Sequence, residues 1–242
     1  MLRAGVRSDK TDQRAIAVGV LALLRGQRAA VSMASKALDD DHPKVRIAAA
    51  TALGELHATS AIPQLKEALS DKEVGVVLAA AHALVLLKDP SAYEVYYAIL
   101  TGKMKGGKGL VAGELDTLKD PKKMAMLGFQ EGIGFIPFAG IGYSAIKTMM
   151  KDDSSPVRAA AARVLAGDPD PDTTAGLADA AVNDKSELVR IAALEAVARH
   201  DDPAYIGKIA PAMADEKDPV KYTAAAAVAR LTAIGGRHAN SK

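Results

Sequence analysis

Apolar residues along most of this chain recur every three or four positions, the spacing of amphipathic helices, and they do not alternate as they would in strands. Short polar turns interrupt the pattern at residues 57–60, 167–171 and 200–203. An alanine-rich segment precedes each turn, and where the next segment is clearest, at residues 61–69 and 204–213, it is again amphipathic. The pattern therefore predicts an all-α chain made of helical hairpins.

The hairpins repeat. Aligning the alanine-rich segments places one basic position in register, at intervals of 31 or 32 residues and one of 81, with valine in one copy. The aligned positions are Arg14, Arg46, Val77, Arg158, Arg190 and Lys221. The interval of 81 corresponds to one repeat plus a long insertion. A fixed period of this length is typical of solenoids.

Each repeat opens with the same local signals. An acidic turn, such as residues 39–41 or 152–153, comes first and can cap a helix and complement its dipole. Proline follows at Pro43, Pro156 and Pro219, where the first helical turn tolerates it because no partner for its missing N–H is needed. The alanine run then favours helix and permits close packing between helices.

These residues resemble the HEAT-repeat family, and within it the bacterial subset called PBS-lyase HEAT-like repeats. The resemblance rests on the acidic turn, the Pro-x-Val-Arg segment or a variant of it, and the alanine-rich helix. It implies an α-solenoid, or superhelix, of about six repeats, and a ladder in which recurrent Asp and Arg residues tie neighbouring repeats together. The expected ladder positions are Arg14, Arg46, Arg158, Arg190 and Lys221. Val77 should interrupt that ladder in the third repeat.

The repeats set the expected domain organisation. Repeats one to three occupy residues 11–102, and repeats four to six, the last one partial, occupy residues 152–234. The ends, at residues 1–10 and 235–242, are expected to be flexible. Residues 103–151 form an insertion that is rich in glycine, expected to be partly helical, and contains all three phenylalanines.

Three hypotheses describe the insertion. Its Phe and Ile residues form a satellite core against the second helix of the third repeat, around residues 93–100. Alternatively, they line a groove for a partner together with the tyrosines of that helix, since insertions in repeat proteins often lie on the binding face. A third hypothesis is peripheral membrane contact through the apolar, glycine-rich loop and its flanking lysines.

Composition narrows the classes of function. The chain has 242 residues, a net charge of +2 and no cysteine, which excludes disulfides and zinc-thiolate sites and gives no basic excess for nucleic acid. No apolar run has the length of a signal peptide or of a membrane span. A cytoplasmic protein is expected, and the alternative is a secreted or periplasmic protein whose leader has been removed.

The search for catalytic chemistry gives no constellation. The histidines show neither His-x-x-x-His nor His-Glu spacing, which argues against a helical metal site and against the iron-dependent hydroxylases of the HEAT-like class. Residues 106–109 are glycine-rich, but they lack the strand and the Gly-Lys-Ser/Thr ending of a phosphate-binding loop. With no tryptophan and balanced charge, a HEAT-like DNA glycosylase is not favoured either. We expect no enzymatic activity, no metal and no cofactor.

The sequence therefore predicts a non-enzymatic protein–protein interaction module or scaffold that binds through its concave row of second helices and its insertion. The alternatives are a pigment- or cofactor-handling factor similar to bilin lyases, an enzyme accessory subunit, and a self-assembling repeat protein or homo-oligomer. Aromatic residues concentrate at the expected contact centre. The candidate partner-binding residues are Tyr93, Tyr96, Tyr97, Lys103, Lys105, Lys108, Phe129, Phe135, Phe138 and Tyr143.

Overall fold

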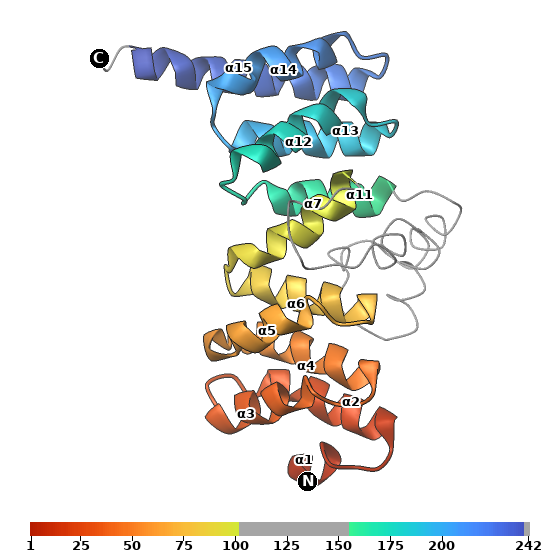
Figure 1. Ribbon diagram of the computed structural model, residues 1–242. Coiled ribbons are helices and arrows are strands. Elements are labelled where there is room, and N and C mark those ends of the chain that lie inside the picture. Colours follow the sequence, from red (N-terminus) through yellow and green to blue (C-terminus); the bar gives the residue numbers. More distant parts are fainter. Residues whose placement is uncertain (102–154, 240–242) are drawn as a thin grey trace. The chain divides into compact units, whose positions relative to one another are not determined.

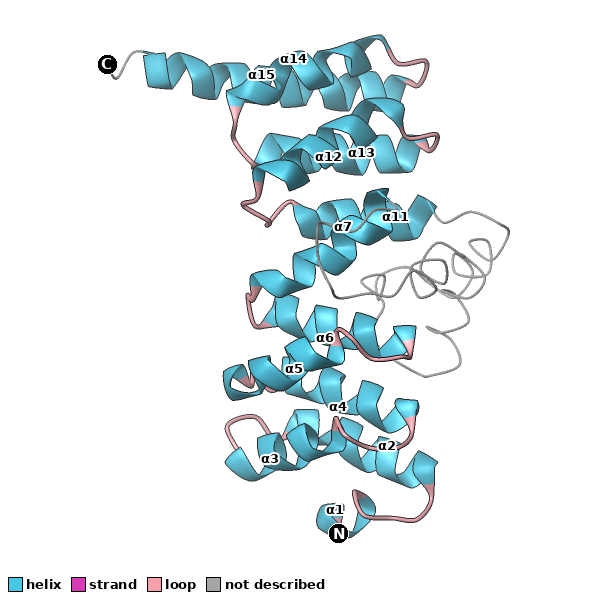
Figure 2. Cartoon of the chain, in the orientation of Figure 1, coloured by secondary structure: helices cyan, strands magenta, loops and turns pink. Residues whose placement is uncertain are grey.

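The structure is a computed structural model that describes residues 1–101 and 155–239, and all regular secondary structure in these residues is helical (Figures 1 and 2). The described residues fall into two compact units. Unit 1 contains residues 1–95, and unit 2 contains residues 96–101 and 155–239. The chain is thus an all-α repeat protein of the solenoid class, as the sequence pattern predicts.

Unit 1 is a stack of helical hairpins preceded by a short helix (Figure 1). In chain order its elements are α1 (Leu2–Gly5), α2 (Thr11–Gly19), η1 (Val20–Leu23), α3 (Arg28–Ala37), α4 (Pro43–Glu55), η2 (Thr59–Ala61), α5 (Ile62–Ala68), α6 (Val74–Leu86), η3 (Pro90–Ala92) and the start of α7 (Tyr93–Thr101). The first helices α2, α4 and α6 pack on one another in this order, and α3 and α5 pack beside them.

Unit 2 repeats this arrangement. Its elements after the end of α7 are α11 (Ser155–Leu165), α12 (Pro171–Asn183), α13 (Glu187–Arg199), η4 (Pro203–Tyr205), α14 (Ile206–Ile209), η5 (Ala210–Ala214) and α15 (Asp218–Ala239). The first helices α11, α13 and α15 again pack in order, with α12 and α14 beside them. The three prolines of the repeat motif lie in the first turns of α4, α11 and α15.

One arginine in most repeats joins two successive turns of the stack. Arg46 directs Nε and Nη2 at the carboxylate of Asp71, at 2.7 and 2.9 Å, while its Nη1 donates to the carbonyl oxygen of Asp40 at 2.9 Å. Arg190 lies 2.7 Å from Asp215 and donates to the carbonyl of Asp184 at 2.8 Å. Arg46 and Arg190 are buried, so these charge-assisted interactions form largely out of solvent.

The same geometry recurs at the other arginines of the motif. Arg14 forks onto Asp40 with both distances at 2.9 Å, and Arg158 forks onto Asp184 at 3.2 and 3.0 Å. Lys221 differs, because its ammonium pairs with Asp218 of its own helix at 2.7 Å in an exposed position. Val77 is fully buried.

The aspartates of these pairs also order the turn in which they lie. One carboxylate oxygen accepts the backbone N–H two residues further on: Asp40 from His42 at 2.9 Å, and Asp71 from Glu73 at 2.8 Å. Asp184 and Asp215 do the same. Each carboxylate therefore holds the start of its own repeat and receives the arginine of the previous one.

Alanine and glycine let the first helices approach closely. A methyl group added at Gly54 of α4 would lie 2.9 Å from the Cα atom of Ala83 in α6, closer than atoms can pack without a shift. Eight residues of α4 are buried, and α13 likewise buries eight. The hydrophobic core is thus formed mainly by the first helices.

Helices lie at both ends of the described residues. Residues 2–5 form α1, which packs against α2 so tightly that a Cβ atom on Gly5 would lie 2.8 Å from the Cβ of Ala17. At the other end α15 continues to Ala239, with backbone contacts such as that from Arg237 Nε to the carbonyl of Ala233. Close packing of Gly5 on Ala17 thus supports the helix at the N-terminal end.

Replacing Gly54 by alanine should destabilise unit 1 by about 1–3 kcal/mol, because the new methyl group meets the backbone of α6. The matched control is Gly19→Ala at the end of α2, where nothing lies within 4 Å of the added atom. That change should stabilise by about 0.5–1 kcal/mol through helix propensity. Urea denaturation followed by circular dichroism measures both, and shifts of the same sign would contradict this account.

Replacing Arg46 by alanine should lower stability by about 3 kcal/mol, because it leaves Asp71 and the turn carbonyl at Asp40 without their donor. Lys221→Ala is the control, since its exposed pair should contribute less than about 1 kcal/mol. Denaturant midpoints of the two variants test the difference. Equal losses would show that the arginine does not link the repeats.

Candidate functional site

The tyrosines proposed as a contact centre lie on α7. Asp89 begins this region by accepting the backbone N–H of Ser91 at 3.0 Å, which caps η3 and sets the start of the helix. Tyr93 and Tyr97 are half-buried and lie one helical turn apart. Tyr96 points elsewhere, and its side chain is only 3% exposed.

Tyr96 is a core residue. Its hydroxyl has no hydrogen-bond partner among the described residues, and burial raises the pKa of this phenol well above its ordinary value. Tyr97 packs against α12, where a Cβ atom on Gly176 would lie 2.8 Å from the ring. Tyr93 is half-buried. The remaining candidates, in residues 103–143, lie outside the described residues.

A polar network in unit 2 escaped the sequence analysis. His200, at the end of α13, contacts the hydroxyl of Thr174 through Nδ1 at 2.9 Å and the carbonyl of Leu165 through Nε2 at 3.1 Å. Asp168 accepts the hydroxyl proton of Thr173, and the hydroxyl of Tyr205 donates to the carbonyl of Pro171 at 3.0 Å. The Thr173–Asp168 pair is local. The partners in the other contacts are separated by 26 to 35 residues, so only the fold brings them together.

A threonine hydroxyl beside an imidazole has the composition of a nucleophile and its base. Here the geometry gives it a structural role. Nε2 of His200 must donate its proton to the carbonyl of Leu165, which leaves Nδ1 to accept from Thr174. Thr174 is 4% exposed, so a substrate cannot reach its oxygen. The network ties the turn before α12 to the end of α13.

Metal ligation has no support within residues 1–101 and 155–239, where no group of three or more His, Asp or Glu side chains converges. His82 lies inside α6, and burial lowers the pKa of its imidazole. In the same residues no helix combines the length and apolarity needed to cross a bilayer.

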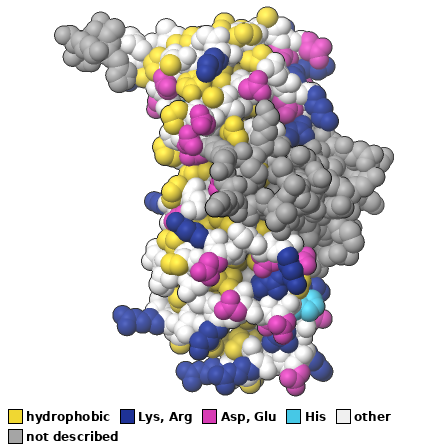
Figure 3. Space-filling view, viewed as in Figure 1, with side chains coloured by type: hydrophobic (Ala, Val, Ile, Leu, Met, Phe, Trp, Pro, Cys, Tyr) yellow, Lys and Arg dark blue, Asp and Glu magenta, His cyan; other side chains and the backbone are white. Residues whose placement is uncertain are grey.

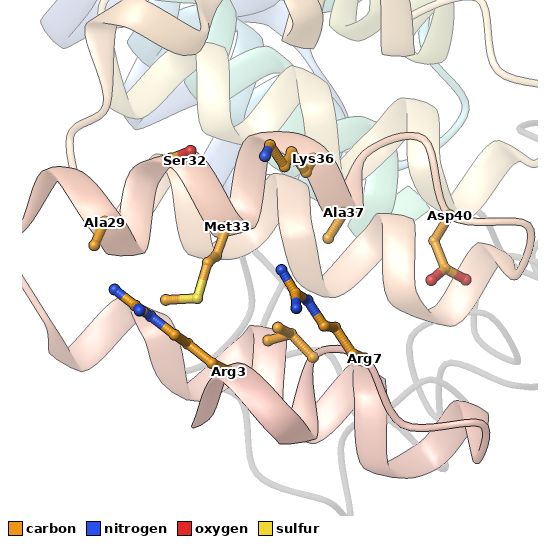
Figure 4. Close-up of a pocket in the computed structure, with 9 residues that line it drawn as sticks. Arg3, Arg7, Ala29, Ser32, Met33, Lys36, Ala37 and Asp40 are labelled. Carbon is orange, nitrogen blue, oxygen red and sulfur yellow. The ribbon is translucent and has the colours of Figure 1, made fainter. Parts of the chain in front are cut away.

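A groove lies between α1 and α3 in the described part of the chain. Its volume is about 390 Å³, and it lies entirely within unit 1. Arg3 and Arg7 reach it from α1 and the turn that follows, while Met33 points from α3 into the space between them (Figure 4). Several Lys and Arg side chains gather at this end of unit 1 (Figure 3). The groove has no counterpart among the sequence-based predictions, because residues 1–10 were expected to be flexible.

Comparison with protein families identifies the repeats. The family of HEAT repeats matches residues 1–85, 31–101 and 144–229, which together span most of the chain. The chain therefore belongs to the HEAT-repeat family, as the acidic turns and alanine-rich helices indicate. Comparison with curated proteins gives no match.

Solved structures with similar folds come from several sources. They include the CpcE–CpcF complex of phycocyanin lyase from Nostoc sp. PCC7120, with 22% identity, coverage of 96% of this chain and 91% of that chain, and a TM-score of 0.43. Human deoxyhypusine hydroxylase in complex with glycerol has 18% identity, 96% coverage of both chains and a TM-score of 0.36. A designed armadillo repeat protein has 15% identity, 95% and 98% coverage, and a TM-score of 0.45.

The stability of the folded protein at acidic pH should depend on the ion pairs between repeats. The Arg14 guanidinium, which hydrogen-bonds to Asp40, holds the pKa of that carboxyl below its usual range. A depressed pKa in the folded state gives stability that is present above the unfolded value of about 4 and is lost as the pH falls below it. Asp40→Asn should therefore lower the thermal midpoint at pH 7 and flatten its fall between about pH 5 and pH 3.

The control for this profile is Asp12→Asn, whose carboxylate is 81% exposed and lies 3.5 Å from Lys44. Its midpoint should follow that of the wild type at every pH. If Asp40→Asn keeps the full acid-induced loss, the pair does not contribute to the pH dependence.

Proposed function

We propose that this protein is a non-enzymatic scaffold that binds a protein partner through its row of second helices together with residues 103–151. The observation that carries the proposal is the unequal burial of the two helices in the hairpins α4–α5 and α13–α14. Helices α4 and α13 bury eight residues each, whereas α5 buries Leu65 and α14 buries Ile209. These second helices thus keep most of their side chains available to a partner, as in other solenoids.

The polar and charged groups that already have partners within the chain support this proposal, because they are excluded as binding residues. The arginines of the motif and the hydroxyl–imidazole network of unit 2 are occupied by turns, carbonyls and neighbouring helices. These groups therefore maintain the frame, and recognition falls to the outer faces of the second helices, to Tyr93 on α7 and to the proposed insertion.

Deleting residues 103–140 should abolish partner capture and keep the helical repeats. Tagged wild-type and deleted proteins are compared by quantitative pull-down from cells of the source organism, and circular dichroism checks that helix content is retained. Undiminished capture by the deleted protein would reject the role of the insertion. If the deleted protein unfolds, Tyr93→Ala replaces it, since Tyr93 is half-buried and its removal should weaken capture without unfolding α7.

The same preparations separate a scaffold from a cofactor-handling factor. Purified protein is examined by its absorbance spectrum and by metal analysis. A chromophore, nucleotide or metal present at one equivalent per chain would contradict a pure scaffold.

A further inference from the structure

We propose that the groove between α1 and α3 binds an acidic peptide segment that carries an apolar side chain between its carboxylates. This inference rests on the proposed function, because it assigns a chemistry to one partner segment. The residues that line the groove all lie between Arg3 and Asp40 in the sequence, so variants can test the two proposals independently.

Three uncompensated cations line the groove. Arg3, Arg7 and Lys36 are exposed, and within the described residues none of them has an ion-pair partner. Two of the three carry guanidinium groups, which bind carboxylates through two parallel hydrogen bonds. Three like charges around one groove favour an anionic occupant.

The one carboxylate at the groove, Asp40, does not neutralise these cations. Its two oxygens accept from Arg14 at 2.9 Å each, and one of them also accepts the backbone N–H of His42. Its charge is therefore committed to the inter-repeat pair, and in Figure 4 its carboxylate lies beyond Arg7, away from Arg3. Arg3, Arg7 and Lys36 remain available to a ligand.

The floor of the groove is apolar. Val6 and Met33 contribute to its lining, and Ala29 and Ala37 of α3 extend the apolar lining along the helix. Met33 lies between the two arginines (Figure 4), and methionine adapts its shape to irregular ligands. An occupant that matches this lining carries an apolar side chain flanked by two acidic groups.

The length of the groove favours a peptide over a small anion. The lining positions on α3 run from Ala29 to Ala37, which at 1.5 Å per residue is about 12 Å. An extended chain rises about 3.3 Å per residue, so about four residues cover this distance. A single phosphate would reach one arginine and leave the apolar floor empty.

The test measures binding of a fluorescein-labelled peptide, Glu-Glu-Leu-Glu-Glu, to the full chain by fluorescence anisotropy. We expect saturable binding that weakens as sodium chloride rises, and at least tenfold weaker binding of the peptide in which glutamine replaces each glutamate. The double variant Arg3→Gln/Arg7→Gln should weaken binding at least tenfold, and Met33→Gln by several-fold. Arg28→Gln is the matched control, because Arg28 is an exposed cation on the same helix that does not line the groove, and it should change affinity less than twofold.

Four outcomes would overturn the inference. Equal binding of the glutamine peptide, or equal weakening by Arg28→Gln, would show nonspecific attraction. Inorganic phosphate that displaces the peptide at concentrations near the Kd of the peptide would show that the groove is a site for simple anions. Sedimentation of the chain with phosphatidylserine vesicles, lost in the double arginine variant and without peptide binding, would identify a membrane as the occupant.

The proposed function is tested separately by the pull-down. Wild-type protein that binds the peptide but captures no partner rejects the scaffold and keeps the groove. Partner capture by a chain that does not bind the peptide rejects the groove alone.

Discussion

The arginine fork between successive turns is the interaction on which the rest of this structure depends. Alanine side chains are small and interdigitate little, so packing alone would not fix the axial alignment of neighbouring helices in the stack. The Arg46 fork onto Asp71, with its third nitrogen on the turn carbonyl at Asp40, fixes the helices along their axes. Removing one partner would leave a buried charge or an unsatisfied turn. The arginine fork thus sets the alignment of successive helices, while the burial of alanine and the close contact at Gly54 stabilise their packing.

Much of this could be predicted from the sequence, because the repeat encodes it locally. The period, the prolines in the first turns and the helical class all follow from patterns within one unit of about 30 residues. Helix α1 is harder to predict from the sequence, because it depends on the contact between Gly5 and Ala17 rather than on a motif. The pairing of Lys221 with Asp218 is a local contact between residues three positions apart on one helix, and it differs from the inter-repeat pairs of the arginines.

The candidate site was predicted less well, for a physical reason. Composition shows that tyrosines concentrate on α7, but burial depends on the helix's orientation, which sends Tyr96 into the core and Tyr97 onto Gly176. The contact between His200 and Thr174 joins residues 26 positions apart that share no motif. The groove likewise brings Arg3 and Arg7, in or just after α1, together with Met33 on α3. Such sites are products of packing, and one sequence carries no local signal for them.

The spacing of the ion pairs also separates fixed from variable parts of the repeat. From each paired aspartate to the next aligned basic position, or to the valine that replaces it, the distance is six residues, as from Asp40 to Arg46 and from Asp184 to Arg190. From arginine forward to its aspartate it is 26 residues for Arg14 and 25 for Arg46. The difference between repeats of 31 and 32 residues therefore falls in the segment that runs from the arginine to its aspartate. Each module thus joins a connector of constant length, from the aspartate to the next aligned position, to a segment of variable length, so a change in that segment leaves the geometry of the connector unchanged.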